Sequence, residues 1–260
     1  MTAATDKDLR SEVAFLAREL KTPVITETFA ALGDQAREQG WSHEEYLAAV
    51  LGHQVASRTA NGTRMRTAAA HFPAVKTIED FTFDHIPATT RDVIAHLATT
   101  TFVAKRDNVV LLGPPGTGKS HLAIALGIKA AEASCPVAFD SATDWISRLA
   151  TAHAEGRLDR ELRKLGRYRL LVIDEAGYLP FDATAASLFF QLIASRHETG
   201  SVIVTSNLTF SRWGETLGDD VAAAATIDRL VHHAQVIALD GDSYRTRGHR
   251  TTPPPTQTRN

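Results

Sequence analysis

The chain of 260 residues contains one cysteine, no membrane-length apolar run and almost no net charge. A single thiol, Cys135, cannot form an internal disulfide, and a cysteine-based zinc site is not expected. The formal net charge of −2 excludes a uniformly basic coat for nucleic acid, although a local basic patch would still act through its own field. The apolar runs fall far short of the roughly 20 residues of a membrane span, and the N-terminus has no features of a secretion signal. We therefore expect a soluble, cytoplasmic protein with no membrane partner.

The composition is that of a folded protein, with 43% hydrophobic and 22% charged residues, which excludes a fully disordered chain. The length suffices for one sizeable α/β domain and one small domain. The patterns predict four regions: a helical domain over 1–70, a connector over 71–88, an α/β domain over 89–250 and a disordered tail over 251–260.

Helix signals divide the N-terminal region. Thr22 followed by Pro23 predicts a helix that Thr22 caps and that ends near Gly40. The segment 42–45 has the sequence of a capping box and opens a further helix. The pair Asn61-Gly62 is expected to interrupt that helix.

Short apolar strands that alternate with helices dominate the rest of the chain. This alternation predicts an α/β fold with a parallel sheet covered by helices. Aromatic residues of the connector, Phe81 and Phe83, are expected to pack onto this domain. The expected strands are 109–112, 136–139, 170–173, 201–205 and 236–239.

The segment 113–120 matches the phosphate-binding pattern G-x-x-x-x-G-K-[ST] between a strand and a helix. Its glycines let backbone amides face phosphate oxygens, and the helix N-terminus adds partial positive charge. We expect Lys119 to contact the β- and γ-phosphates of ATP and Ser120 to ligate Mg²⁺. The expected nucleotide-binding residues here are Gly113, Pro114, Pro115, Gly116, Thr117, Gly118, Lys119, Ser120 and His121.

Two adjacent carboxylates, Asp174 and Glu175, follow the strand 170–173. Carboxylates at the end of a buried strand are costly unless they coordinate or catalyse. We expect Asp174 to hold Mg²⁺ through water and Glu175 to orient and deprotonate the attacking water. Asn207 follows the next strand and is expected to help position that water.

Two arginines are candidates for completing a nucleotide site held by a neighbouring subunit. Arg229 lies in an apolar helix, where it is expected to be exposed near a subunit edge, and Arg245 follows the last strand. An arginine donated to a neighbour's γ-phosphate stabilises transition-state charge and couples hydrolysis to assembly. A surface ion pair is the alternative for each.

The order of these motifs resembles the IstB-like ATPases, which are AAA+ helper proteins of insertion-sequence transposition and relatives of the helicase loader DnaC. The resemblance runs from about residue 8 to residue 248. The segments YLPFD and HHAQVIALDGDSYR are more specific than the phosphate-binding loop, which very many ATPases share. The segments that carry the resemblance are GPPGTGKS, LLVIDEAGYLPFD, VIVTSNLTFSRWGE, ATIDRLVHHAQVIALDGDSYRTRG and NGTRMRTAAAHFPAVKTIEDFTFD.

The resemblance implies a P-loop NTPase fold of the AAA+ ASCE type, with a small N-terminal all-helical domain for oligomerisation or partner binding. Residues 246–260 are too few for a full C-terminal lid. It also implies an ATPase that binds ATP and Mg²⁺, assembles as a homo-oligomer on duplex DNA, bends that DNA, and recruits or stimulates a transposase. By position, Lys119 and Ser120 belong to Walker A, Asp174 and Glu175 to Walker B, Asn207 is sensor 1, Arg229 the arginine finger and Arg245 sensor 2.

A basic segment is the candidate DNA contact. Arg157, Arg160, Lys164 and Arg167 have the spacing of one helical face and would form a stripe for DNA phosphates. A solvated helix face is the equal alternative. Without a base-reading motif, we expect backbone and shape recognition with strong salt dependence.

Two other functions are alternatives to the transposition helper. A DnaC-like helicase loader would use ATP as a switch on single-stranded DNA. A small-molecule kinase would have no need of the water-activating acid expected at Glu175.

Overall fold

The computed structural model describes residues 6–84, 86–178, 180–218 and 220–239. The chain divides into two compact units, with the boundary between Met65 and Arg66. None of the helices within the described ranges is long and apolar enough to cross a membrane.

Three helices build the first unit: α1 (Asp6–Glu19), α2 (Pro23–Gln39) and α3 (His43–Ala69), whose last residues belong to the second unit. Helix α2 begins and ends as the sequence predicted, and Gly40 closes it in the left-handed conformation, with φ of 67°. The capping box is confirmed. The Ser42 amide donates to the Glu45 carboxylate at 2.7 Å, and the Glu45 amide donates to the Ser42 hydroxyl at 3.2 Å.

The prediction that Thr22 caps α2 is wrong. The Thr22 backbone (φ −122°, ψ 62°) leaves its side chain without a capping hydrogen bond, and its hydroxyl donates instead to the Ala17 carbonyl at 3.2 Å. A residue distant in sequence supplies the acceptor, because Gln54 Oε1 accepts the Val24 amide at 3.1 Å. Tertiary packing therefore replaces the local cap.

The predicted break at Asn61-Gly62 is also wrong, since α3 continues to Ala69. A helical glycine costs only about 1 kcal/mol relative to alanine. The Asn61 side chain bonds within the helix, donating to the Ser57 hydroxyl at 3.5 Å and accepting from Arg64. In the second unit, Arg66 Nε donates to the Ala131 carbonyl at 2.8 Å, which holds the end of the helix in place.

The second unit contains a five-stranded parallel sheet with the order β2-β3-β4-β1-β5. The strands form where the apolar segments predicted them. Their bounds are β1 (Asn108–Leu112), β2 (Val137–Ser141), β3 (Leu170–Ala176), β4 (Ser201–Ser206) and β5 (Ala234–Ala238). The helices are α4 (Ala88–Ala98), α5 (Thr101–Lys105), α6 (Lys119–Glu132), α7 (Ala142–Ala154), α8 (Leu158–Leu165), α9 (Ala183–Arg196), α10 (Trp213–Leu217) and α11 (Asp220–Val231), with a 3-10 turn at Phe210–Arg212.

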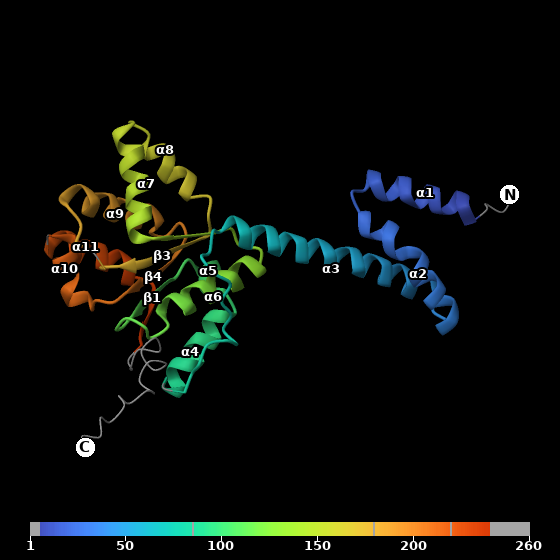
Figure 1. The fold of residues 1–260 in the computed structure, drawn as a ribbon, viewed down its shortest axis with the longest axis horizontal. Coiled ribbons are helices and arrows are strands. Elements are labelled where there is room, and N and C mark those ends of the chain that lie inside the picture. Colours follow the sequence, from blue (N-terminus) through green and yellow to red (C-terminus); the bar gives the residue numbers. More distant parts are fainter. Residues whose placement is uncertain (1–5, 85, 179, 219, 240–260) are drawn as a thin grey trace, which may run out of the picture. The chain divides into compact units, whose positions relative to one another are not determined.

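Helices cover both faces of this sheet (Figure 1). On one face, α7, α9 and α11 bury Trp145, Phe189 and Leu230 against the strands. On the other face, α4 and α6 form the cover, and the connector packs there as the sequence predicted. Phe81 and Phe83 meet edge to face, with ring centroids 4.8 Å apart. Each face of the sheet is thus covered by its own hydrophobic core.

Candidate functional site

The carboxyl ends of β1, β3 and β4 bring three predicted motifs to one edge of the sheet. Strand β1 runs into the loop 113–118, from which α6 starts at Lys119. Strand β4 lies between β1 and β3. Asn207, which follows β4, is therefore placed between the phosphate-binding loop and the acidic end of β3.

The loop 113–118 depends on glycine at two close approaches. Gly113 has φ of 148°, and a Cβ there would lie 2.2 Å from the Leu239 carbonyl oxygen. Gly118 has φ of 91°, and a Cβ there would lie 2.4 Å from Cε2 of Phe81 in the connector. No other residue type fits either position without displacing a neighbour.

Two polar side chains of the loop donate hydrogen bonds to the loop's own backbone. Lys119 is 8% exposed, and its Nζ donates to the Pro114 carbonyl at 2.7 Å. The Thr117 hydroxyl donates to the same carbonyl at 2.9 Å. Pro115 and Gly116 form the turn of the loop, where Gly116 has φ of 84°. The ammonium group of Lys119 thus lies against the backbone of the loop that the sequence predicted for phosphate.

His121, the last residue of the predicted nucleotide-binding set, is engaged by the connector. A ring nitrogen lies 2.7 Å from the Thr77 carbonyl oxygen, and the ring meets Phe81 edge to face at 5.4 Å between centroids. The connector therefore lies against both the start of α6 and Gly118.

Asp174 and Glu175 occupy different environments. Asp174 is 8% exposed, and its Oδ1 accepts hydrogen bonds from the hydroxyls of Ser120 (2.9 Å) and Thr205. The Glu175 side chain is exposed, and its backbone has φ of 60°. The pairing of β3 with β4 shifts register between Ile173 and Ala176. Strained backbone of this kind is often found at functional sites.

The residues at this edge fit a magnesium ion. Ser120 Oγ and Asp174 Oδ1 are oxygen donors 2.9 Å apart, one from each motif, and Mg²⁺ in nucleotide sites takes few protein ligands of this kind. The buried Oδ1 of Asn207 has no hydrogen-bond partner among the described residues. An unpaired buried oxygen at this edge is available to a bound group.

Thr205 is a site residue that the sequence analysis missed. Its hydroxyl donates to Asp174 Oδ1 and accepts the Glu175 amide at 2.9 Å. It thereby ties the end of β4 to both carboxylate residues of β3. The available signal was the change from apolar to small polar residues at the end of the strand 201–205.

Arg229 lies in the last turn of α11, where its side chain is less exposed than the sequence predicted. It is half-buried, and its guanidinium carbon lies 4.3 Å from the centroid of the Phe190 ring. Its Nη1 is buried without a hydrogen-bond partner in the described part of the chain. The apolar face of α9 explains the difference, since Phe190 covers the guanidinium. Arg245 lies outside the described residues, as does the predicted tail 251–260.

The predicted basic stripe is not a single helix. Helix α8 ends at Leu165, Arg157 precedes it with φ of −115° and ψ of 12°, and Arg167 lies beyond Gly166. A left-handed turn at Gly156 and the short helix break the expected periodicity.

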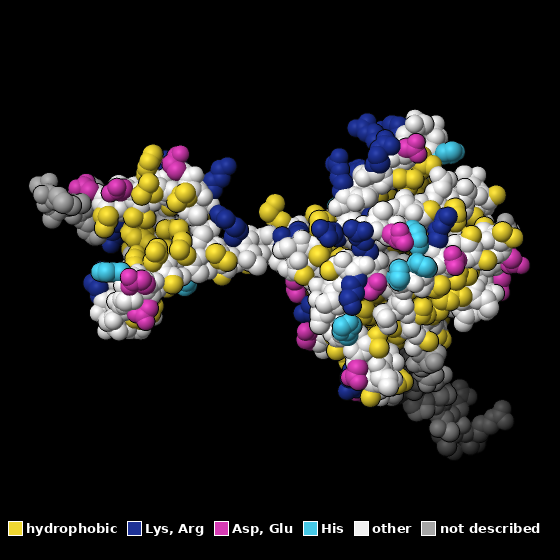
Figure 2. Space-filling view, turned by 180° about the vertical axis from the view of Figure 1, so that it is seen from behind, with side chains coloured by type: hydrophobic (Ala, Val, Ile, Leu, Met, Phe, Trp, Pro, Cys, Tyr) yellow, Lys and Arg dark blue, Asp and Glu magenta, His cyan; other side chains and the backbone are white. Residues whose placement is uncertain are grey.

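The same basic residues nevertheless line one hollow of about 950 Å³ bounded by β2, α7 and α8. Figure 2 shows Lys and Arg side chains gathered at one end of the α/β unit. Arg157 pairs with Glu155, and Arg148 and Lys164 approach Glu161. The exposed arginines of the hollow with no ion pair to any described residue are Arg160, Arg163 and Arg167.

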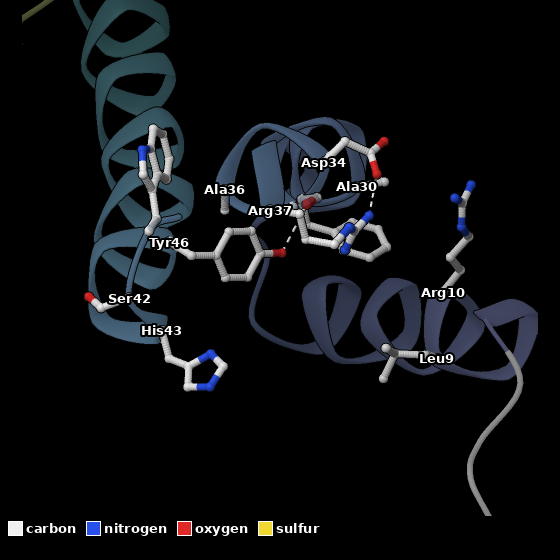
Figure 3. A pocket seen from close by; sticks show the side chains of 12 residues that line it. Leu9, Arg10, Ala30, Asp34, Ala36, Arg37, Ser42, His43 and Tyr46 are labelled. Atoms are coloured by element: carbon white, nitrogen blue, oxygen red, sulfur yellow. Dashed lines mark hydrogen bonds and ion pairs between the residues drawn. The ribbon is translucent and has the colours of Figure 1, made fainter. Parts of the chain in front are cut away.

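The first unit has a separate hollow of about 610 Å³ between its three helices. Phe29, Trp41 and Tyr46 give it aromatic walls, and Arg10 and Arg37 also line it. Figure 3 shows Tyr46 reaching from α3 toward α2, where its hydroxyl donates to the Phe29 carbonyl at 2.9 Å.

The fold and the edge geometry define a P-loop nucleotide-binding domain of the AAA+ type. The comparisons with known proteins narrow this class. The family model described as IstB-like ATP binding protein matches residues 15–252, and the chain belongs to this family.

Two relatives illustrate the similarity. The chain is 41% identical to the insertion sequence IS21 putative ATP-binding protein of Pseudomonas aeruginosa, over 92% of this chain and 90% of that protein. It is 36% identical to the corresponding IS5376 protein of Geobacillus stearothermophilus, over 93% of this chain and 96% of that protein.

Solved structures support the fold alone. The DnaC helicase loader superposes with a TM-score of 0.51 at 20% identity, over 67% of this chain and 99% of that chain. The replication initiator DnaA bound to AMPPCP and single-stranded DNA gives a TM-score of 0.53 at 18% identity, over 64% of this chain and 50% of that chain.

Proposed function

We propose that the protein hydrolyses ATP in assemblies that form on duplex DNA, where it bends the DNA and recruits or stimulates a transposase. The observation that carries the hydrolytic part is the hydrogen-bond chain from Ser120 through Asp174 and Thr205 to the Glu175 amide. This chain joins the phosphate-binding loop to the acidic residues. The relatives named for insertion sequences support the transposition part.

Each residue at the carboxyl edge has a distinct role in the proposed reaction. Lys119 binds the β- and γ-phosphates of ATP, and the loop amides orient them. Glu175, exposed at the edge, accepts a proton from the attacking water. Asn207 holds that water through its buried Oδ1, which has no hydrogen-bond partner among the described residues. Ser120 and Asp174 hold Mg²⁺, which when bound neutralises charge on phosphate oxygens.

Arg229 is proposed to act on the nucleotide of a neighbouring copy, and Arg245 to act as sensor 2. The Phe190 ring restrains the Arg229 guanidinium, so that little ordering is required on contact. Turnover then depends on assembly, because the charge that stabilises the transition state comes from another subunit.

The first unit is proposed as the oligomerisation or partner domain. Leu47, Leu51 and Val55 lie at intervals of four residues on α3, and all three are exposed. Helix α1 exposes Phe15 and Leu20 in the same unit. Figure 2 shows hydrophobic side chains gathered on the surface of this unit. Clusters of exposed apolar side chains often mark interaction surfaces.

The basic hollow is proposed as the contact for the DNA backbone. Three of its arginines are free of ion pairs among the described residues, so their charge is available to phosphates. Because no described feature of the hollow reads bases, we expect the protein to recognise the backbone and shape of DNA.

A single series of ATPase measurements tests this function. Glu175→Gln is expected to retain ATP binding and to lose hydrolysis by about 100-fold or more, since a positioned base contributes about that much. Lys119→Ala is expected to weaken ATP binding itself. Normal hydrolysis by Glu175→Gln would refute the assignment of the base.

The same measurements separate the two DNA-dependent functions. Stimulation of hydrolysis by duplex DNA supports the transposition helper. Stimulation only by single strands would replace it with the helicase loader.

A further inference from the structure

A small cationic hollow of about 250 Å³ lies at the amino-terminal edge of the sheet. It forms where α5, α9 and α11 end, beside the first residue of β1, Asn108. Lys105, Arg106 and Arg229 contribute its cationic side chains, and Glu198 is the one carboxylate among its lining residues. Three histidines complete the lining: His197, His232 and His233.

The hydrogen bonds among the described residues leave N–H donors of the arginines in this hollow available. Arg106 uses Nη1 to donate to the Glu198 carbonyl at 2.7 Å, which leaves most of its five N–H groups available. Nη1 of Arg229 has no hydrogen-bond partner among the described residues. The Glu198 carboxylate lies 3.9 Å from His197 Nε2. Guanidinium and ammonium groups with available N–H donors favour a phosphate ligand.

The size of the hollow limits what it can accept. Sites for whole small molecules measure roughly 300–1,000 Å³, so this hollow admits a phosphate group but not a complete nucleotide. The rest of such a ligand must be held elsewhere, by another surface.

The chain's own phosphate-binding loop cannot supply that phosphate. Asn108 borders the hollow at one end of β1, and Gly113 follows the other end. At about 3.3 Å per residue, the strand separates Asn108 from Gly113 by roughly 17 Å along its length. The phosphate that reaches the hollow therefore belongs to a second molecule.

We propose that Lys105 and Arg106 form, together with Arg229, a composite site that receives the terminal phosphate of ATP bound to a second copy of this chain. This proposal rests on the proposed function and adds two residues to the single arginine assigned there. The link from Arg106 to the Glu198 carbonyl holds the α5 end against the α9 end, and it anchors the Arg106 guanidinium in the hollow that Arg229 also lines.

The test replaces Arg106 without disturbing its backbone. Arg106 has φ of 64°, a conformation that asparagine tolerates well, so Arg106→Asn removes the charge and keeps the turn. Lys21→Asn is the matched control, because Lys21 is an exposed cation with φ of 55° in the first unit. ATP turnover by Arg106→Asn is expected to fall by about 10-fold or more, as for loss of one preorganised donor. Its affinity for ATP as an isolated subunit, and turnover by the control, stay at wild-type values.

Mixing experiments then establish that the residue acts across subunits. Glu175→Gln subunits carry an intact cationic hollow but do not hydrolyse, so adding them to Arg106→Asn subunits is expected to restore turnover. The double variant Glu175→Gln/Arg106→Asn is expected to restore none. Equal effects of the two additions would overturn the proposal.

The remaining outcomes distinguish failure of the composite site from failure of the proposed function. If Arg229→Ala lowers turnover and Arg106→Asn does not, the composite site is refuted and the proposed function stands. If the wild-type protein hydrolyses no ATP, the composite site and the proposed function are both refuted.

Cations near helix ends can also have a purely structural role, because they offset the partial negative charge there. A purely structural role of that kind would lower the Tm of Arg106→Asn and leave turnover per folded subunit unchanged, which also overturns the proposal. Weaker duplex binding with normal turnover would assign the site to DNA instead.

Discussion

Replacing the three arginines of the basic hollow that have no ion pair to a described residue is expected to reduce the salt dependence of DNA binding. The variant is Arg160→Gln/Arg163→Gln/Arg167→Gln. All three side chains are exposed and free of ion pairs to the described residues, so that each can neutralise one phosphate. Because none is buried, the substitutions leave the core intact.

The magnitude follows from counterion release. Each phosphate contact contributes about −0.9 to the slope of log affinity against log salt. Loss of three contacts therefore makes the slope shallower by about 2.7. Between 50 and 200 mM salt the concentration rises fourfold, and four to the power 2.7 is about 40. The wild-type affinity should fall about 40-fold more than the variant's affinity over this range.

Fluorescence anisotropy with a duplex of about 60 base pairs measures this slope, under a non-hydrolysable ATP analogue that keeps the nucleotide state constant. Arg157→Gln is the matched control within the hollow. Arg157 already pairs with Glu155, and its substitution should change the slope less than any one of the three. Equal slopes for wild type and the triple variant would refute the hollow as the DNA contact. A flat wild-type affinity would refute phosphate binding altogether.

Three further substitutions test the site and its surroundings. Thr205→Val removes the hydroxyl that bonds Asp174 and should slow hydrolysis with little effect on ATP affinity, at a cost of about 1–3 kcal/mol in thermal unfolding. Gly118→Ala places a methyl group against Phe81, and calorimetry should show ATP affinity weakened about 10-fold or more, as P-loop backbone contacts are lost. Burial, and then repulsion from a neighbouring aspartate, raise the pKa of Asp140 above its ordinary 3.8. A carboxyl with a raised pKa stabilises the fold below its unfolded-state pKa and loses that contribution as pH rises through its folded pKa. Asp140→Asn should therefore raise Tm at pH 7 and lose this advantage toward pH 4, which scanning calorimetry can follow.

The phosphate-binding loop and the strands could be predicted because their signals are local. Segment 113–120 needs glycines and a lysine at fixed spacing, and the buried parallel strands appear as short apolar runs. Ser120 and Asp174 could be paired before the structure, since the carboxyl ends of parallel strands share an edge. The observed distance of 2.9 Å between them agrees with that expectation.

The remaining features depend on contacts between distant segments. The cap of α2 comes from Gln54, and the continuation of α3 past Asn61-Gly62 is supported by packing that no local pattern contains. Arg229 was expected to be exposed because its own helix gave no sign of Phe190 on α9. Thr205 escaped notice because small polar residues end many strands, and only the strand order places it between the two acidic residues and the loop.

The position of Thr205 explains how two consecutive acids serve different purposes. In a regular strand, Glu175 would face the layer opposite Asp174, where helices cover the sheet and burial of a charge is prohibitively costly. The register shift and the left-handed backbone instead expose its carboxylate at the edge, with a strain of about 1–3 kcal/mol. That strain persists only where surrounding contacts fix it, and the Thr205 hydroxyl does so by accepting the Glu175 amide while donating to Asp174. One hydroxyl thus keeps the proposed metal-binding acid buried and the proposed base accessible to water.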